Sequence, residues 1–158
     1  MYENENSSYC YNGTNILINV LDIKDLDTLK EYEQVVTSLK LLELEKNVVL
    51  GNFDIMHFCK IHKFLFEEIY PFSGMFRIEN IAKDNFRFAD WKYIEKSLLE
   101  LLEKLKSENY LVGLNKLEIS SRLAYYLSEL NVIHPFREGN GRVSREFIRE
   151  LALKNNYY

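Results

Sequence analysis

One short segment near the C-terminal end, residues 134–145 with the sequence HPFREGNGRVSR, concentrates the residue types that could do chemistry. It holds one of the three histidines and two of the six glycines in the whole chain. A histidine can accept a proton near neutral pH, a carboxylate can hold a hard divalent cation, and arginines match phosphate oxygens. Glycines let backbone amides approach an anion, and a helix N-terminus favours negative charge. The segment therefore predicts a site where a nucleotide, a metal ion and a base meet.

The elements on either side of this segment must position it. Residues 116–132 are apolar on more than one side, which predicts a central, buried helix. Pro135 pushes His134 towards an extended conformation, which ends this helix and directs the imidazole into the loop. A last helix then runs from Gly141 to about Lys154, with four apolar residues expected to face inward: Val143, Phe147, Ile148 and Leu151.

Two arginines lie on the first turn of this last helix. Arg142 and Arg145 are three residues apart, so they share one face of the helix. Cations at a helix N-terminus oppose the dipole, which costs stability unless an anion is bound there. This local conflict indicates a functional role for both side chains.

The remaining sequence predicts a mostly helical chain. Apolar spacing indicates a helix over residues 27–47, with Asp27 as its N-cap, another over 54–70, and a third beginning at Trp91. Residues 75–88 instead alternate between apolar and polar around Lys83-Asp84-Asn85, which is typical of a short β-hairpin. We therefore expect an all-α fold with one short hairpin, preceded by an irregular N-terminal arm over residues 1–26, with the domain covering residues 27–158.

Composition excludes several functional classes. With 158 residues and 47% hydrophobic residues, the chain can bury the core of one domain. Its net charge of −4 argues against direct binding to nucleic acid, which needs a basic face. No apolar run reaches the roughly 20 residues that a membrane span needs, and the polar, acidic N-terminus does not resemble a signal peptide. Two cysteines do not make a disulfide framework, so a cytoplasmic location is the default expectation.

The segment at 134–145 matches the Fic family signature H-x-F-x-[D/E]-G-N-G-R-x-x-R at every fixed position. Residues 70–77, YPFSGMFR, and 81–89, IAKDNFRFA, resemble the flap with which this family docks its protein targets. The resemblance covers most of the chain, from about Asp27 to the end. It implies a Fic-type helical domain with the hairpin beside the active site.

The resemblance also implies an activity, in which a target hydroxyl attacks the α-phosphate of ATP, AMP is transferred and pyrophosphate leaves with Mg²⁺. His134 is then the general base, and Glu138 holds the Mg²⁺. The residues implied to bind the nucleotide are Arg137, Glu138, Gly139, Asn140, Gly141, Arg142 and Arg145 in the motif, and Lys83, Asp84, Asn85 and Phe86 in the flap. Glycine rather than lysine at position 141 is the AMP-transferring pattern within the family.

Other interpretations remain open for several residues. His57 and His62 are five apart on a helix, which is not a metal-binding spacing, so both are expected to be structural. Arg137 and Arg149 could equally be surface charges. The chain could also be a nucleotide-binding regulator without catalysis, or a Fic enzyme that transfers another phosphate-containing group. An intact histidine in the motif argues against a pure binding protein.

The sequence also bears on regulation. Many Fic proteins carry an inhibitory helix with the pattern [S/T]-x-x-x-E-[G/N], and this pattern is not found in the chain. The chain therefore resembles the class that is inhibited by a separate small antitoxin protein, and Arg142 and Arg145 are expected to be open to ATP. Toxins of this class modify DNA gyrase and topoisomerase IV, which makes their subunits the expected targets.

Overall fold

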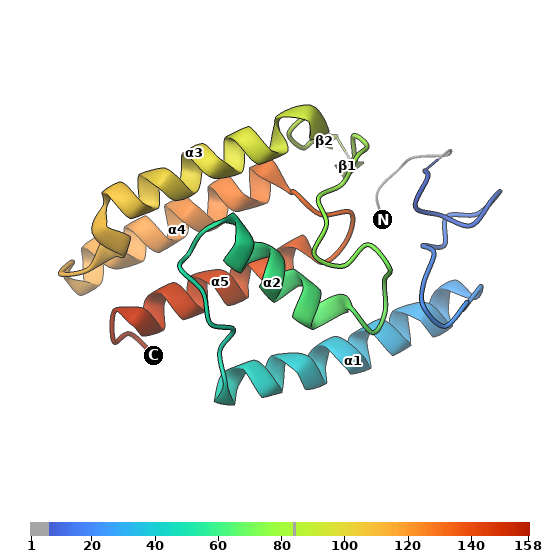
Figure 1. The fold of residues 1–158 in the computed structure, drawn as a ribbon, viewed down its shortest axis with the longest axis horizontal. Helices are drawn as coiled ribbons and strands as arrows, with labels where there is room; N and C mark the ends of the chain where they lie inside the picture. Colours follow the sequence, from blue (N-terminus) through green and yellow to red (C-terminus); the bar gives the residue numbers. More distant parts are fainter. Residues whose placement is uncertain (1–6, 84) are drawn as a thin grey trace.

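The structure is a computed structural model that describes residues 7–83 and 85–158. Figure 1 shows its helices and the small hairpin in chain order. They are α1 (Leu26–Lys46), α2 (Ile55–Phe66), β1 (Ala82–Lys83), β2 (Phe86–Arg87), the 3₁₀ turn η1 (Trp91–Tyr93), α3 (Ile94–Ser107), η2 (Asn109–Leu111), α4 (Lys116–Ile133) and α5 (Asn140–Lys154). The prediction of an all-α fold with one short hairpin is confirmed.

Short polar side chains start three of the helices by accepting hydrogen bonds from their first amides. Asp25 caps α1 through the amide of Thr28, and Asp54 caps α2 in the same way. Asn115 starts α4 with a reciprocal capping box that involves Glu118. The expectation that Asp27 caps the first helix is wrong, because Asp25 is the residue whose side chain reaches the orphan amide.

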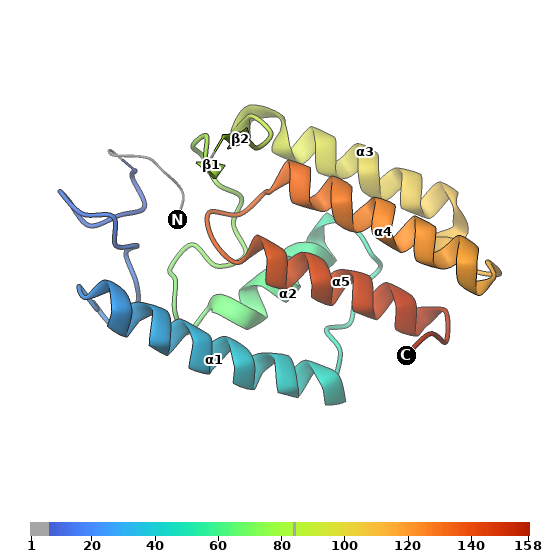
Figure 2. The ribbon, with the colours of Figure 1, turned by 180° about the vertical axis from the view of Figure 1, so that it is seen from behind.

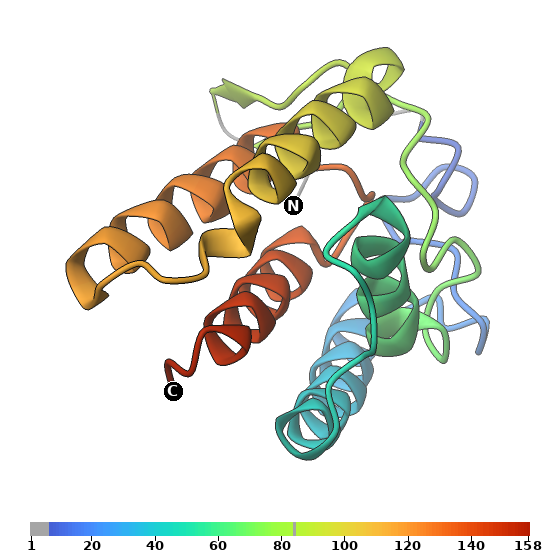
Figure 3. The ribbon, with the colours of Figure 1, turned by 60° about the vertical axis from the view of Figure 1, so that its left-hand side comes forward.

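The helices pack in a continuous series in which α1 contacts α2, α2 contacts α5, α5 contacts α4, and α4 contacts α3. The α4–α5 connection, the hairpin strands β1 and β2 and residues 7–25 lie on one side of the molecule, to the right in Figure 1, and the C-terminus lies on the opposite side (Figures 1 and 2). Figure 3 shows α5 between α4 and α2. This arrangement brings the motif of residues 134–145 next to the hairpin, although 46 residues separate Phe88 from His134.

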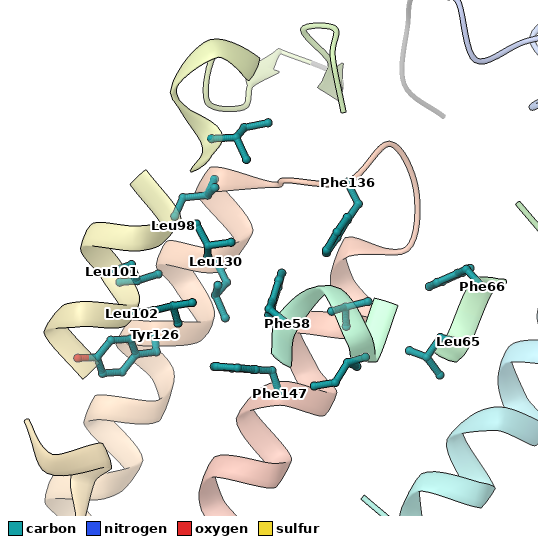
Figure 4. Close-up of a cluster of buried hydrophobic side chains, with 14 of the residues drawn as sticks. Phe58, Leu65, Phe66, Leu98, Leu101, Leu102, Tyr126, Leu130, Phe136 and Phe147 are labelled. Atoms are coloured by element: carbon teal, nitrogen blue, oxygen red, sulfur yellow. The ribbon is translucent and has the colours of Figure 1, made fainter. Parts of the chain in front are cut away.

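The core is centred on aromatic side chains from α2, α5 and the connection that precedes α5. Phe58 and Phe66 of α2, Phe136 and Phe147 are all fully buried, and Figure 4 shows Phe136 pointing from the connection towards Phe58. The expectation that the helix over residues 116–132 is the buried central one is wrong. The side chain of Leu117 in α4 is 82% exposed, because α4 buries only the residues that face α3 and α5.

The hairpin is shorter than the alternation over residues 75–88 predicts. Its register pairs Ala82 with Arg87 and Lys83 with Phe86. The segment before it does not pair with a second strand, because the backbone amide of Arg77 donates to the carbonyl of Pro135 in the motif at 2.9 Å. Within the described residues, no helix has the length and apolar character needed to cross a bilayer.

Candidate active site

His134 ends α4 in the left-handed conformation, with φ 51° and ψ 60°. Its amide still donates to the carbonyl of Leu130 at 3.0 Å, so it forms the C-cap of the helix. The prediction of an extended backbone here is therefore wrong. Proline disfavours only the right-handed helical conformation of the preceding residue, and the left-handed cap ends the helix equally well.

The imidazole of His134 is held in one tautomer. A backbone carbonyl can only accept, so the 3.1 Å contact between Nδ1 and the carbonyl of Asn131 requires a proton on Nδ1. The ring stacks on Phe88 of the hairpin segment, with 3.7 Å between ring centroids. Burial, helped by the charges of Arg77 and Lys83, lowers the pKa of His134 to about 4, although the hydrogen bond to Asn131 acts in the opposite direction. The ring is therefore neutral at pH 7, with its basic lone pair on Nε2.

Three side chains fix the loop that follows His134. Phe136 is fully buried and stacks on His62, with 3.8 Å between ring centroids. The amide group of Asn140 closes the loop, since its Oδ1 accepts from the backbone N–H of Phe136 at 2.8 Å and its Nδ2 donates to the Phe136 carbonyl at 2.7 Å. His62 donates from Nε2 to the carbonyl of Glu138 at 3.1 Å and accepts the amide of Gly74 at Nδ1. The loop is therefore rigid before any ligand binds.

The first turn of α5 faces this loop without a capping side chain. Gly139 precedes it with φ 79°, in the left-handed region, and Asn140 is the first helical residue. The side chain of Asn140 is already engaged by Phe136, so this residue can offer an anion only its backbone amide. Because the first amides of a helix have no partner within it, those of Asn140 and Gly141 form the part of the site that suits a phosphate.

Arg142 is engaged on several sides. Its Nη2 lies 2.5 Å from the carboxylate of Glu33 in α1, and its Nη1 donates to the hydroxyl of Thr37 at 3.1 Å. The same guanidinium lies over the ring of Phe66 and 3.7 Å from the carboxylate of Glu138. The expectation that Arg142 is open to a nucleotide is therefore wrong, because α1 places Glu33 against it.

Arg145, by contrast, has an exposed side chain and makes no ion pair within the described part of the chain. Its Nη1 lies 3.1 Å from the position that a Cβ atom would take on Gly141, so the guanidinium lies next to the first turn of α5. This places one cation beside the uncapped amides, where it can reach a bound phosphate.

The carboxylate of Glu138 lies 3.7 Å from the guanidinium of Arg142, and its side chain is partly exposed. Its Oε1 accepts from the amide of Gly139 at 2.9 Å. Loss of water around the carboxylate raises the pKa of Glu138, and the charge of Glu33 raises it further. Two carboxylates thus share the single guanidinium of Arg142, an arrangement that an additional cation would stabilise. The described residues contain no ready-made cluster of three metal-binding side chains, so a metal here would rely on Glu138 and on phosphate oxygens.

Arg137 differs from Arg142 and Arg145, the other two arginines of the motif, in how deeply it is buried. It is buried, with Nε 2.9 Å from the carboxylate of Glu79, in the segment that leads into the hairpin. The interpretation of Arg137 as a surface charge is therefore wrong. Arg149, the other open case, is partly exposed and is bound by Glu146 and by the carbonyl of Leu44.

The flap residues lie on the hairpin beside His134. Lys83, Asn85 and Phe86 are exposed, and Phe86 contacts Phe88 edge-on, with 5.3 Å between ring centroids. The charge of Lys83 is felt at His134. Asp84 lies outside the described residues.

Two contributors to the site, Glu33 and Arg77, were not predicted from the sequence. The position of Glu33 could have been noticed in the sequence, because it lies four residues after Leu29 and four before Thr37. These spacings put it on the buried face of α1. A carboxylate on such a face needs a partner. Nothing in the sequence around Arg77 indicates its role, because it also donates to the carbonyls of Ala89, Ile133 and His134, which lie 12 to 57 residues further along the chain. The prediction that His57 is structural agrees with its position, 2% exposed and bound to Val49 and Glu150.

The chain is similar to known proteins of one family. Residues 52–152 match the model of the Fic/DOC family. The chain is 41% identical over 157 residues to the protein adenylyltransferase VbhT of Bartonella schoenbuchensis, covering 99% of this chain but only 33% of that protein. It is 36% identical to the probable protein adenylyltransferase Fic of Salmonella typhimurium, covering 94% of this chain and 74% of the relative.

Solved structures show the same fold. BepC of Bartonella tribocorum with bound AMPPNP superposes with a TM-score of 0.88 at 28% identity, covering 93% of this chain and 77% of that one. The Fic domain of a Bartonella quintana effector with bound ADP also gives a TM-score of 0.88, at 26% identity, covering 93% and 76%. The family match, the relatives and the loop geometry lead to one conclusion: this chain belongs to the Fic/DOC family.

Proposed function

We propose that this chain is a protein adenylyltransferase that transfers AMP from ATP to a hydroxyl side chain of a protein target and releases pyrophosphate. The observation that carries the proposal is the neutral His134 beside the uncapped start of α5. In this proposal His134 is the base and the first amides of α5 are the anion site, both on one loop that Phe136 and Asn140 hold. The adenylyltransferase names of the relatives and the adenine nucleotides bound in the Bartonella structures support the same reaction.

In this reaction Nε2 of His134 takes the proton from the target hydroxyl as its oxygen attacks the α-phosphorus. The bond from that phosphorus to the bridging oxygen breaks, and pyrophosphate leaves. The amides of Asn140 and Gly141 and the guanidiniums of Arg142 and Arg145 neutralise the phosphate charge. The protein contributes mainly position and charge, as expected for reactions of this kind.

The proposal is tested by incubating the full chain with bacterial lysate and ATP that is labelled either at the α- or at the γ-phosphate. AMP transfer predicts label on protein from α-labelled ATP only. Label from γ-labelled ATP would indicate phosphorylation, and label from neither would leave nucleotide binding without transfer.

We further propose that Mg²⁺ accompanies the nucleotide and that Glu138 is its protein ligand, where it would neutralise phosphate charge. We expect Glu138→Gln to raise the Mg²⁺ concentration needed for half-maximal transfer by at least about tenfold, since even partners of metal ligands are worth about 10–100-fold. The measurement is AMP incorporation against Mg²⁺ concentration. Glu100→Gln is the matched control, because Glu100 is an exposed glutamate of α3. An unchanged Mg²⁺ requirement in Glu138→Gln would exclude the assignment.

Glu33 should oppose nucleotide binding, because its carboxylate occupies the guanidinium that the phosphates need. Gln at this position keeps a hydrogen-bond acceptor for Arg142 but removes the competing charge. We expect Glu33→Gln to lower the dissociation constant of ATP by up to about fivefold, in line with the at most about 1 kcal/mol of a partly exposed ion pair. Calorimetric titration with AMPPNP measures this change.

The control for this titration is Glu31→Gln, which makes the same change on an exposed face of the same helix. An affinity for AMPPNP that is unchanged or weaker in Glu33→Gln than in Glu31→Gln would show that Glu33 orients Arg142 rather than competing for it.

We also propose partners, domain limits and location. The exposed edge of the flap suits pairing with an extended target segment, and subunits of DNA gyrase or topoisomerase IV are the proposed targets. Because Arg145 is exposed, a glutamate from a separate antitoxin protein could pair with it.

The proposed domain covers residues 27–158, with residues 1–26 as an arm, and the proposed location is the cytoplasm.

A further inference from the structure

Arg77 has the largest side chain among the fully buried residues, with 1% exposure. It lies between α2 and the hairpin, 57 residues before His134 in the sequence. A guanidinium is costly to remove from water unless its donors are bound. The position of this charge therefore depends on the acceptors around it.

The acceptors of Arg77 belong to two separate parts of the site. Its Nε donates to the carbonyl of His134 at 2.9 Å, and its Nη2 donates to that of Ile133 at 3.3 Å. Its Nη1 donates to the carbonyl of Glu79 at 2.7 Å, and its Nη2 also donates to that of Ala89 at 2.5 Å. The first pair of acceptors lies at the end of α4, and the second pair lies at the two ends of the segment that contains the flap.

Both sets of acceptors have a physical reason to accept a cation. The last carbonyls of a helix have no partner within it and lie at the negative end of its dipole. The carbonyls of Glu79 and Ala89 flank a two-stranded ribbon, which is marginally stable without support from the rest of the protein. One planar guanidinium thus fixes both ends of the ribbon to the helix end that carries His134.

The hydrogen bonds of Arg77 also fix the surroundings of the His134 imidazole. Phe88, which stacks on His134, directly precedes Ala89, whose carbonyl Arg77 holds. A second bond, from the amide of Ala89 to the carbonyl of Val132 at 3.2 Å, joins the same two segments. The flap therefore cannot move far from the base while Arg77 stays in place.

We propose that Arg77 is a positioning residue that sets the distance and angle between the flap and His134. A target segment paired to the flap then presents its hydroxyl to Nε2. This inference rests on the proposed AMP transfer, because it concerns the same site. Arg77 is buried, with 1% exposure, and holds the flap rather than the start of α5, so its effect should appear in transfer to protein rather than in nucleotide binding.

The test compares Arg77→Lys with the parent chain. Lysine keeps the charge but cannot reach acceptors on both segments with one planar group. We expect AMPPNP affinity within about twofold of the parent, and AMP transfer from α-labelled ATP to lysate protein at least about tenfold slower per folded molecule. The matched control is Arg149→Lys, since Arg149 also donates to a backbone carbonyl, that of Leu44, away from the flap. Its transfer rate should equal that of the parent.

Two outcomes overturn the inference. One is a parent-like transfer rate in Arg77→Lys together with reduced thermal stability, which would leave only a structural role. The other is equal loss of AMPPNP binding and transfer. Failure of the proposed function is distinguishable, because the parent chain itself would then transfer no AMP.

A second variant keeps the test decisive if Arg77→Lys does not fold. Phe88→Leu weakens the same coupling from the flap side by removing the stacked ring. We expect slower transfer, unchanged AMPPNP affinity and an acidic limb of the pH–rate profile that moves to higher pH, because the imidazole becomes more hydrated. A parent-like rate and pH profile in Phe88→Leu would overturn the inference.

Discussion

Replacing His134 with alanine is expected to abolish AMP transfer while leaving nucleotide binding intact. A positioned base contributes about 10²–10⁴-fold to a rate, so transfer should fall by at least that factor. AMPPNP affinity should stay within about twofold, because the anion site consists of backbone amides and arginines. Single-turnover transfer from α-labelled ATP and calorimetric titration measure the two quantities. A parallel loss of affinity and rate would assign His134 to nucleotide binding instead.

The pH dependence of the parent chain tests the same role. The base works only when neutral, and burial lowers the pKa of His134 to about 4, below the usual value of 6.5. Transfer should therefore be constant between about pH 5.5 and 7.5 and should fall as the pH drops through about 4. A midpoint near 6.5 would mean that His134 is solvated in the working enzyme. Because the pKa of Glu138 is raised, the profile should be repeated with Glu138→Gln at saturating Mg²⁺.

Gly139→Ala is the change with the largest expected effect on stability. A Cβ atom at Gly139 would lie 2.2 Å from Cζ of Phe66, and the residue has φ 79°. The left-handed backbone costs about 1–2 kcal/mol for a residue with a Cβ atom. Overpacking a core adds about 1–3 kcal/mol. We therefore expect the free energy of unfolding to fall by about 2–5 kcal/mol, measured by urea denaturation.

Gly113→Ala is the control that separates these two costs. Gly113 has φ 90°, but a Cβ atom there would meet nothing within 4 Å. Only the backbone cost of about 1–2 kcal/mol should remain. Equal destabilisation by the two variants would show that Phe66 moves aside without cost.

Much of this protein follows from local rules that the sequence displays directly. Capping residues such as Asp54 and Asn115, and the apolar spacing of the helices, depend on neighbours within a few residues. The motif is equally local, because the base, the carboxylate, the glycines and the arginines are joined by one short loop. The sequence was therefore enough to predict the helical fold, the family and the candidate site residues.

Errors arose where distant segments meet. Glu33 of α1 reaches Arg142 of α5 across 109 positions of sequence, so the state of that arginine could not be inferred from the motif. The short hairpin, the exposed side of α4 and the burial of Arg137 against Glu79 likewise depend on which helices pack together.

The sequence by itself determined which residues of the motif are candidates for the site, because their types and spacing lie within one continuous segment. Only the tertiary structure decided how that segment is set for chemistry. The tautomer and lowered pKa of His134 follow from burial and from contacts with Asn131 and Phe88. Its alignment with the flap depends on Arg77. Desolvation and hydrogen bonds between remote segments exist only after folding. A local sequence pattern therefore does not show the tautomer or the pKa of a side chain.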